Sequence, residues 1–341
     1  MGPARPPDWS SPRSPTARIT HSAWALNRSP QPFDMVWPGR LARATRRLGA
    51  VMAVVLVTGC STGIGLEAAL AFARRGDTTY ASMRNLAKAD SLRERAAEEG
   101  LTVAVVQLDV TDNDSVVAAI RSIEDRHGAV DVLVNNAGIG SSGPIESIDL
   151  DKAAAVYDTN IWGAVRTVRA ALPAMRAKGA GVIINVTSVA GRVPGTPYGG
   201  FYSSSKHALG TLSEALAWEV APFGIRVACV EPGFFATEIF ASSDWKVPAM
   251  AGPYEADQQW MNDFYVKSGE AMGADPAVAG ARIADVAADH SSPLHNLVGE
   301  DAFQFVDLVA QAGTFEGWIT VGTGIVEGVT GTRPVSPTQP G

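Results

Sequence analysis

The chain contains only two cysteines, Cys60 and Cys229, among 341 residues. Two cysteines exclude a disulfide framework and favour a reducing compartment, so we expect a cytoplasmic protein. No stretch reaches the ~18 consecutive apolar residues that a membrane-spanning helix requires, so no membrane span is expected. The five histidines show no paired spacing. A metal site is therefore not expected either.

Positive charge is also scarce, with 28 Lys and Arg against 35 Asp and Glu and a formal net charge of −7. This balance argues against a nucleic-acid binder that neutralises phosphates with a basic face. The charge is uneven, because residues 1–50 carry eight Arg but only two acidic residues. These residues are rich in Pro and show no helix or strand periodicity. We expect 1–50 to be a disordered leader, or absent from the cell because translation starts at Met35 or Met52.

The rest of the chain has the composition of a globular protein, with 46% hydrophobic residues over the whole sequence. From Val51, short apolar runs alternate with longer amphipathic stretches. The runs, which we expect to be strands buried on both faces, cover 51–58, 78–83, 102–108, 129–134, 181–187 and 226–230. The amphipathic stretches, which we expect to be helices, cover 66–75, 87–99, 112–127, 151–177 and 202–221. In the third of these, Asp112 is expected to cap the start and Gly128 to end the helix.

Repeated β-α units with short connections predict a doubly wound α/β Rossmann fold, in which a mostly parallel seven-stranded sheet carries helices on both faces. We expect a single domain over 51–325 and a flexible tail over 326–341. Ligands of such folds bind at the carboxyl ends of the strands, so the chemistry is expected there.

A glycine-rich loop follows the first predicted strand and opens the first predicted helix. Gly59 permits a tight turn, Gly63 lets the backbone approach a pyrophosphate, and Gly65 allows the helix to pack closely on the strand. The N-terminus of the helix faces the bound anion. The candidate dinucleotide ligands in this loop are Gly59, Ser61, Thr62, Gly63, Ile64 and Gly65.

The Gly-x3-Gly-x-Gly spacing resembles the short-chain dehydrogenase/reductase family. Residues 292–302 and Trp318 are similar to the 17β-hydroxysteroid and retinol dehydrogenase-like branch of that family. The matching motifs follow the family's order at 58–65, 135–138, Asn160, Ser188, 202–206, Pro232-Gly233 and Thr237. The resemblance is strong from about 51 to 230. It implies an oxidoreductase that moves a hydride between a nicotinamide cofactor and an alcohol, ketone or aldehyde.

The candidate catalytic residues follow from this resemblance and from one helical spacing. Tyr202 and Lys206 are four residues apart, so on a helix both side chains emerge on one face. The ammonium, together with an oxidised nicotinamide, is expected to lower the phenol's pKa from about 10 toward the working range. We therefore expect Tyr202 to be the general acid/base and Lys206 to tune it and bind the nicotinamide ribose. The resemblance implies that Ser188 orients the substrate oxygen and that Asn160 holds a proton-relay water.

The choice of nicotinamide depends on the end of the second predicted strand. NAD-selective sites place an acidic residue there, whereas this chain has Met83 followed by Arg84. A guanidinium can pair with the 2′-phosphate of NADP, so we expect NADP(H), with NAD as the alternative. The resemblance implies further cofactor contacts at Asp109, Val110, Asn136, Gly138, Tyr202, Lys206, Pro232, Gly233 and Thr237.

The stretch over 234–275 is rich in aromatic residues, and the resemblance implies that it forms a lid over the substrate. We expect a water-poor pocket for a bulky, apolar alcohol or carbonyl compound that is steroid-, retinoid- or lipid-like. Core packing or dimer contacts account for these aromatics equally well. The resemblance also implies a homodimer or homotetramer joined through the helices at 151–177 and 202–221.

Two other interpretations belong to different functional classes. A nicotinamide-binding sensor or scaffold would keep the fold without catalysis, although an intact set of Ser188, Tyr202 and Lys206 argues against it. An epimerase or dehydratase is disfavoured by the glycine spacing. The sequence identifies neither the substrate nor the physiological direction of the reaction.

Overall fold

The computed structural model describes residues 52–239 and 253–334, all of which belong to one unit of the chain, Leu48–Gly341. The predicted leader over 1–50 lies outside the described residues. So do residues 240–252 of the predicted lid and the last seven residues of the predicted tail, 335–341.

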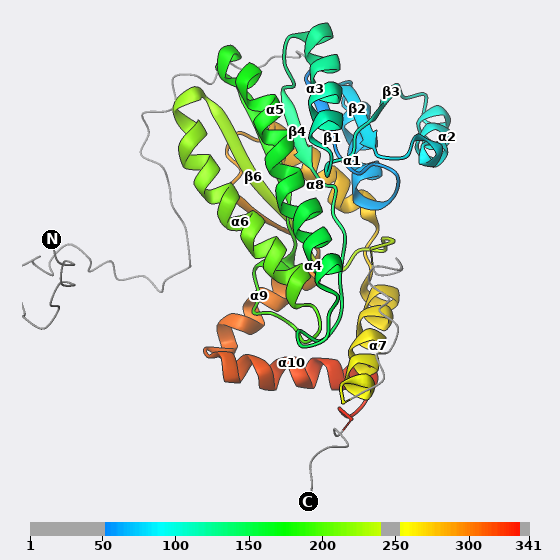
Figure 1. Cartoon of the computed structure of the whole chain (residues 1–341), viewed down its shortest axis with the longest axis vertical. Helices are drawn as coiled ribbons and strands as arrows, with labels where there is room; N and C mark the ends of the chain where they lie inside the picture. The colour runs from blue at the N-terminus through cyan, green and yellow to red at the C-terminus, as the bar shows by residue number, and fades with distance from the viewer. Residues whose placement is uncertain (1–51, 240–252, 335–341) are drawn as a thin grey trace, which may run out of the picture. The chain divides into compact units, whose positions relative to one another are not determined.

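A seven-stranded sheet, with every strand parallel to its neighbours, forms the centre of this unit (Figure 1). The strands are β1 (Val54–Val57), β2 (Thr78–Met83), β3 (Val103–Gln107), β4 (Val132–Asn135), β5 (Gly181–Val186), β6 (Ile225–Pro232) and β7 (His295–Val298). Their order is β3-β2-β1-β4-β5-β6-β7, so the direction of winding reverses between β1 and β4. The predicted Rossmann fold is confirmed.

The register of the sheet brings the loops after its central strands together. Val57, the last residue of β1, lies opposite Ala81 of β2 and Val134 of β4. All residues of β1 and β4 are buried, because helices cover both faces of these strands. Ligands of doubly wound folds bind at the carboxyl ends of the strands where the strand order reverses, which here are β1 and β4.

Two helical layers cover the sheet. One layer contains α1 (Gly63–Arg74), α2 (Asp90–Glu98) and α8 (Pro276–Ala288), whose apolar side chains share one hydrophobic core. The other contains α3 (Asn113–His127), α5 (Gly163–Lys178) and α6 (Gly200–Val220), which pack into a second core. Figure 1 shows α3, α5 and α6 in front of the sheet and α8 behind it.

Three further helices lie beyond the carboxyl end of the sheet, at the bottom of Figure 1: α7 (Glu255–Met272), α9 (Glu300–Ala312) and α10 (Phe315–Thr330). Helices α7 and α10 share a hydrophobic cluster that includes Phe234, Phe264 and Val326. The prediction that the tail starts at 326 is therefore wrong, because Val326 is buried and α10 continues to Thr330. The burial of one α10 face orders this segment.

Local sequence signals set several helix ends as expected. The Asp112 side chain accepts hydrogen bonds from the backbone N–H groups of Asp114 and Ser115, and Gly128 ends α3 with a positive φ. The helix predicted over 151–177 is interrupted. It consists of α4 (Leu150–Tyr157) and α5, joined by a π-helical turn at Asp158–Trp162. Short 3-10 turns, η2 (Leu86–Lys88), η4 (Val189–Gly191) and η5 (Ala221–Phe223), connect other elements.

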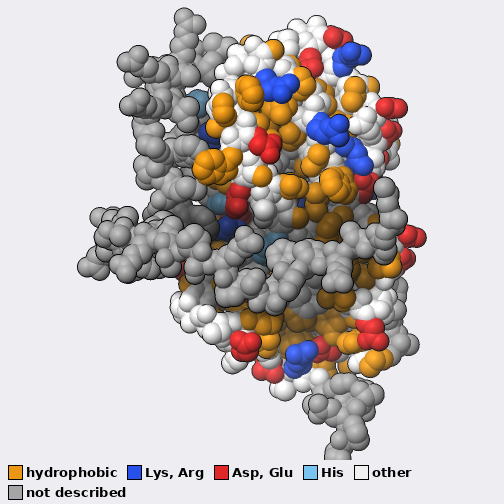
Figure 2. Space-filling view, turned by 60° about the vertical axis from the view of Figure 1, so that its left-hand side comes forward, with side chains coloured by type: hydrophobic (Ala, Val, Ile, Leu, Met, Phe, Trp, Pro, Cys, Tyr) orange, Lys and Arg blue, Asp and Glu red, His pale blue; other side chains and the backbone are white. Residues whose placement is uncertain are grey.

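The visible surface carries a mixture of side chains. Figure 2 shows acidic, basic and hydrophobic side chains interspersed over the described part of this face. Within residues 52–239 and 253–334, no helix has the length and apolar character needed to span a membrane.

The Asp112 cap gives a test of the local account of α3. Replacing Asp112 with Ala leaves two N-terminal N–H groups of α3 without an acceptor, so the free energy of unfolding is expected to fall by about 1 kcal/mol. Asp125→Ala, on the exposed face of the same helix, is the matched control and is expected to leave stability almost unchanged. Urea denaturation of both variants checks this. Equal stabilities for the two variants would contradict the capping role.

Candidate active site

The glycine-rich loop between β1 and α1 is shaped by contacts that leave no room for side chains. Gly59 and Gly63 have φ values of +72° and +60°, which favour glycine. A Cβ on Gly59 would lie 2.8 Å from the Cα of Ala137, and a Cβ on Gly65 would overlap the carbonyl oxygen of Gly59. All three glycines are therefore required for the loop to pack between α1 and the end of β4.

The loop is tied to β4 by hydrogen bonds from residues that the sequence placed at the cofactor. The Thr58 hydroxyl oxygen accepts hydrogen bonds from the backbone N–H groups of Asn136 and Ala137, both at 3.0 Å. The Asn136 side-chain amide donates to the carbonyl oxygens of Thr58 and Gly59, at 2.9 and 3.1 Å. The side chain of Asn136 thus holds the glycine-rich loop in place.

The first turn of α1 offers polar groups on its outer side. Thr62 precedes α1 and is exposed, and its hydroxyl caps no backbone N–H of this helix. The first turn carries no acidic residue. Thr237 lies across from this turn, with its methyl carbon 3.1 Å from the position of a Cβ on Gly63. The unpaired N–H groups of such a turn attract phosphate groups.

The end of β2 has the pattern that the sequence suggested. Met83 is buried, and Arg84 is exposed. Arg84 forms no salt bridge with any carboxylate of the described residues. Its backbone carbonyl accepts a hydrogen bond from Gln107 on the neighbouring strand β3. The guanidinium is therefore available to an anionic ligand.

Asp109 and Val110, which follow β3, make contacts within the chain. The Asp109 carboxylate accepts hydrogen bonds from the backbone N–H and the hydroxyl of Thr111, at 2.9 and 2.7 Å. Val110 is buried, and a Cβ on Gly163 would lie 2.9 Å from its side chain. These contacts fix the loop after β3, and the predicted cofactor contacts of both residues stay predictions.

Three of the four predicted catalytic residues, Ser188, Tyr202 and Lys206, come together at the carboxyl ends of β5 and β6. Ser188 follows β5, and its hydroxyl accepts a hydrogen bond from the N–H of Ala190 and lies 3.4 Å from the carbonyl oxygen of Pro232. Its side chain is also hydrogen-bonded to Tyr202. Tyr202 and Lys206 lie on one face of α6, with Lys206 Nζ 5.8 Å from the centre of the Tyr202 ring.

Lys206 is an ammonium removed from water. Only 4% of the residue is exposed, and Nζ donates a 2.9 Å hydrogen bond to the carbonyl oxygen of Val186. Burial lowers the pKa of Lys206 to about 8. A Cβ on Gly138 would lie 3.3 Å from Nζ, so the absence of a side chain at 138 leaves space beside the ammonium.

The pKa of Tyr202 shifts in the direction opposite to the sequence expectation. Burial of the phenol raises its pKa above 10, and the hydrogen bond with Ser188 opposes this rise. In the chain alone, the effect of burial is larger than that of the hydrogen bond, and the expected lowering by the ammonium together with an oxidised nicotinamide stays a prediction. The chain alone therefore favours the neutral phenol.

Asn160 lies in the π-helical turn between α4 and α5 and is buried. Its side-chain amide donates hydrogen bonds to the carbonyl oxygen of Ile139 and the hydroxyl of Ser205, both at 3.0 Å, and its oxygen accepts one from the N–H of Ile139. One amide hydrogen and the amide oxygen thus hold the loop that carries Gly138, and the other amide hydrogen binds α6. The proton-relay role of Asn160 stays a prediction.

A cavity of about 410 Å³ opens beside Ser188 and Tyr202. Its walls come from the loop between η4 and α6 and from helices α7, α9 and α10, and most of them are apolar. The larger apolar side chains that line it are Phe234, Trp260, Met261, Phe264, Phe305 and Trp318. The described part of the predicted lid thus forms a wall of the cavity and also packs the core beneath it.

Tyr198 and Arg333 line the cavity, and both bind the carboxylate of Asp257. The Arg333 guanidinium pairs with both carboxylate oxygens of Asp257 at 2.7 Å. The Tyr198 hydroxyl donates to the same carboxylate at 2.6 Å, and Tyr198 has a φ of +61°. Arg333 holds the pKa of Asp257 below its usual value. The proline and two glycines that flank Tyr198 are the sequence signal for this loop.

No candidate metal site is found among the residues that the structure describes. No group of three or more His, Cys, Asp or Glu side chains among them is arranged to hold a metal ion.

Comparison with known proteins identifies the class that this fold and this site define. A family model described as short chain dehydrogenase matches residues 53–247. The chain belongs to the short-chain dehydrogenase family, and the family prediction is confirmed.

Individual relatives agree with this assignment. The chain is 35% identical to an oxidoreductase, BOA17, of Botryotinia fuckeliana over 255 residues, which cover 75% of this chain and 92% of the relative. It is 42% identical to human retinol dehydrogenase 8 over 195 residues, which cover 56% of this chain and 61% of that protein. Human 17-beta-hydroxysteroid dehydrogenase type 1 is 40% identical over 53% of this chain and 56% of its own length. The similarity to the predicted branch is thus confirmed for the part of the chain that carries the motifs.

Solved structures show the same fold. A short-chain dehydrogenase from Streptomyces avermitilis has a TM-score of 0.69 at 33% identity, covering 81% of this chain and 99% of that one. An alcohol dehydrogenase from Thermococcus sibiricus, complexed with 5-hydroxy-NADP, has a TM-score of 0.59 at 25% identity, covering 73% of this chain and 95% of that one.

The glycine-rich loop gives a prediction about dinucleotide binding. Gly65→Ala would push a Cβ into the carbonyl of Gly59, so we expect at least a ~10-fold weaker dinucleotide affinity, the equivalent of about 1.4 kcal/mol, by isothermal titration calorimetry. Gly210→Ala in α6 is the control, because a Cβ there meets nothing within 4 Å. Wild-type affinity in Gly65→Ala would contradict the packing account of this loop.

Proposed function

We propose that the protein is an NADP(H)-dependent oxidoreductase that interconverts an alcohol and a ketone or aldehyde, with a bulky, apolar substrate. The observation that carries this proposal is the position of the Ser188–Tyr202 hydrogen bond. The two hydroxyl-bearing side chains line the apolar cavity, and the buried ammonium of Lys206 lies beside them.

The residues at the carboxyl ends of β1 and β2 fit a dinucleotide. The glycines leave a cradle that any Cβ would fill, the first turn of α1 presents backbone N–H groups, and the Arg84 guanidinium is free for a phosphate. Support for NADP also comes from the Thermococcus sibiricus relative and its 5-hydroxy-NADP. We assign Arg84 to the 2′-phosphate and the glycine-rich loop to the pyrophosphate. A bound nicotinamide supplies the hydride in reduction and accepts it in oxidation.

Tyr202 moves the proton that accompanies this hydride. In reduction the phenol donates its proton to the carbonyl oxygen of the substrate, and in oxidation the phenolate removes the proton from the alcohol oxygen. Burial keeps Tyr202 neutral in the chain alone, which is the form that reduction needs. The Ser188 hydroxyl donates a hydrogen bond to the same substrate oxygen and so orients it toward Tyr202.

Lys206 and Asn160 support this proton transfer from the side away from the substrate. The pKa of Lys206, about 8, keeps much of the ammonium charged near neutral pH, where it stabilises the phenolate of Tyr202. Asn160 fixes the loop that carries Gly138 beside the ammonium.

The cavity supports the proposed substrate class. A volume of about 410 Å³ with aromatic and aliphatic walls favours a large apolar molecule over a small polar one. The similarity to retinol dehydrogenase 8 over the motif-bearing part of the chain points in the same direction.

We also keep the proposals of a cytoplasmic location and of a homodimer or homotetramer. Exposed Trp218 and Leu212 on α6 and Trp162 in the π-helical turn support a helix-mediated interface. Light scattering of the purified protein measures its oligomeric state directly.

Tyr202→Phe tests the catalytic proposal. The variant lacks the hydroxyl that moves the proton, so NADPH-dependent reduction of hydrophobic ketones and aldehydes is expected to fall by roughly 10²- to 10⁴-fold. Affinity for NADPH is expected to stay close to that of the wild type. The loss of reduced-nicotinamide absorbance measures turnover, and calorimetry measures binding. Undiminished turnover in Tyr202→Phe would rule out the assignment, and wild-type NADPH binding without turnover on any carbonyl would favour a sensor or scaffold.

Arg84→Ala tests the choice of cofactor. Loss of the guanidinium removes a charged hydrogen bond to the 2′-phosphate, so the dissociation constant for NADPH is expected to rise by about 10- to 100-fold while that for NADH stays unchanged. Arg93→Ala is the matched control, because Arg93 is an exposed arginine of α2 that pairs with Asp90. An equal loss for both cofactors, or no loss for either, would refute the assignment of Arg84.

A further inference from the structure

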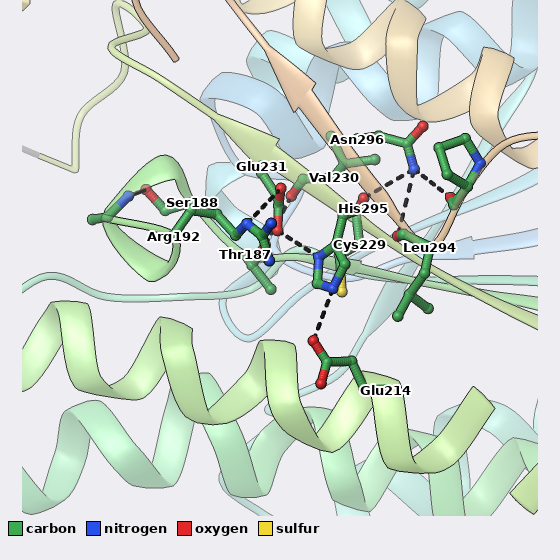
Figure 3. A network of polar contacts seen from close by, with 12 residues as sticks. Thr187, Ser188, Arg192, Glu214, Cys229, Val230, Glu231, Leu294, His295 and Asn296 are labelled. Atoms are coloured by element: carbon green, nitrogen blue, oxygen red, sulfur yellow. Dashed lines mark hydrogen bonds and ion pairs between the residues drawn. The ribbon is translucent and has the colours of Figure 1, made fainter. Parts of the chain in front are cut away.

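A buried carboxylate lies directly behind the turn that carries Ser188. Glu231 on β6 is 1% exposed, and its Oε1 accepts a 2.8 Å hydrogen bond from Nδ1 of His295 on β7 (Figure 3). Its Oε2 is buried without a hydrogen bond and lies 3.6 Å from Nε of Arg192. A buried charge is costly unless it is paired and hydrogen-bonded, so Glu231 depends on Arg192 and His295.

Arg192 connects Glu231 to the catalytic turn. It directly follows η4, the short turn whose N-cap residue is Ser188. In the same turn, a Cβ on Gly191 would lie 2.9 Å from the backbone carbon of Lys206, so the turn is packed against α6 at that position. The ion pair of Arg192 with Glu231 therefore holds the Ser188 turn against β6.

Glu231 also adjoins the other side of the site, because Pro232 and Gly233 follow it in the chain. The carbonyl oxygen of Pro232 lies 3.4 Å from the Ser188 hydroxyl, and Gly233 lines the cavity. A shift of Glu231 would thus move both the Ser188 turn and the loop after β6.

His295 extends the network to the helix that carries Tyr202. Its Nε2 lies 2.9 Å from a carboxylate oxygen of Glu214 on α6, while its Nδ1 bonds Glu231. Figure 3 shows the imidazole between these two carboxylates, with Arg192 on the far side of Glu231. The imidazole therefore joins β6, β7 and α6.

We propose that Glu231, His295 and Arg192 are positioning residues for the reaction, and that they hold the Ser188 turn in place when the imidazole of His295 is protonated. An imidazolium donates from both nitrogens and can satisfy Glu231 and Glu214 together. A neutral imidazole donates from one nitrogen only, so one carboxylate then faces a lone pair. The proposal rests on the proposed function, because it concerns the geometry of that reaction's site.

The groups around His295 determine when it is protonated. Glu231 faces it from β6, Glu214 from α6 and Arg192 from the turn after η4. The thiol of Cys229, also on β6, stays neutral because burial raises its pKa to about 12. The hydrogen bonds to the two carboxylates outweigh burial and raise the pKa of His295 above 6.5. The imidazolium form is therefore present below this raised pKa and is lost as the pH rises through it.

The expected consequence is a pH-dependent turnover. At saturating NADPH and ketone, kcat of the wild type is expected to fall about 10-fold as the pH rises through the pKa of His295, the size of effect that loss of one charged hydrogen bond produces. Lys206 and Tyr202 titrate too, so the experiment must separate His295 from them. Glu214→Gln separates them. It removes an exposed carboxylate outside the catalytic machinery, so it lowers the pKa of His295, whereas Lys206 keeps its hydrogen bond to the carbonyl oxygen of Val186.

The experiment measures the pKa of His295 by NMR of histidine-labelled protein and the pH profile of kcat, in the wild type and in three variants. The chain has five histidines, so His295→Gln assigns the resonance. In Glu214→Gln, the fall in kcat should move to lower pH together with the NMR pKa of His295. In His295→Gln this component of the profile should vanish. His127→Gln, which removes a histidine bonded to Tyr80 far from this network, should leave the profile unchanged.

Two results would overturn the proposal: a fall in kcat that stays in place in Glu214→Gln although the NMR pKa moves, or an unaltered profile in folded His295→Gln. If His295→Gln fails to fold, Glu214→Gln alone decides the question.

A second readout does not need turnover. In the wild type and in Glu214→Gln, the backbone amide resonances of Ser188, Gly191 and Gly233 should titrate with the pKa of His295. Titration of these amides in a protein that reduces no carbonyl would refute the proposed function and leave the network intact, whereas their failure to titrate would refute the network.

Discussion

Lys206 is a buried ammonium, and the geometry of the whole site depends on how α6 accommodates it. Its hydrogen bond to the carbonyl oxygen of Val186 anchors α6 to the end of β5. The helix can approach so closely because Gly138 and Gly191 present no side chains beside Lys206. The same close approach places Tyr202, one turn earlier, against the Ser188 turn. Desolvation lowers the pKa of Lys206 to about 8, so the packing of the helix also sets its proton affinity.

A second buried charge, of opposite sign, lies on the other side of the Ser188 turn. Glu231 is as well buried as Lys206, but it is surrounded by Arg192 and His295. The groups on the two sides of the turn have pKa values shifted in opposite directions. Burial lowers the pKa of Lys206, and the neighbouring carboxylates raise that of His295. A turn of three residues thus lies between two titratable groups whose pKa values are shifted by the packing around them.

Much of this arrangement could be predicted from sequence, because it is encoded locally. The glycine-rich loop needs small residues at fixed spacing, and the steric contacts at Gly59 and Gly65 show why. The Tyr-x3-Lys spacing places Tyr202 and Lys206 on one helical face whatever the surroundings. Alternating apolar runs and amphipathic stretches gave the order of the elements. Each of these signals depends on residues that are close in the sequence.

The features that escaped prediction depend on contacts between distant segments. The interruption of the helix at 151–177 is a π-helical turn that places Asn160 against Ile139 and Ser205, and a single glycine after it, Gly163, is too weak a local signal to predict it. The direction of the pKa shift of Tyr202 follows from burial, which the spacing of two residues does not report. The start of the tail was misplaced for the same reason, because α10 is ordered by packing on α7.

One wall of the cavity shows how such distant contacts complete a locally encoded site. Asp257 lies on α7, Arg333 follows α10, and Tyr198 precedes α6, so one carboxylate joins three segments. The bidentate ion pair neutralises the charge that Arg333 would otherwise bring to an apolar cavity, and the Tyr198 hydroxyl uses the same carboxylate. Because these polar groups satisfy one another, they add no unpaired charge to the wall of the cavity. The hydroxyls of Ser188 and Tyr202 therefore face a lining that is mostly apolar, where electrostatic interactions are stronger than in bulk water.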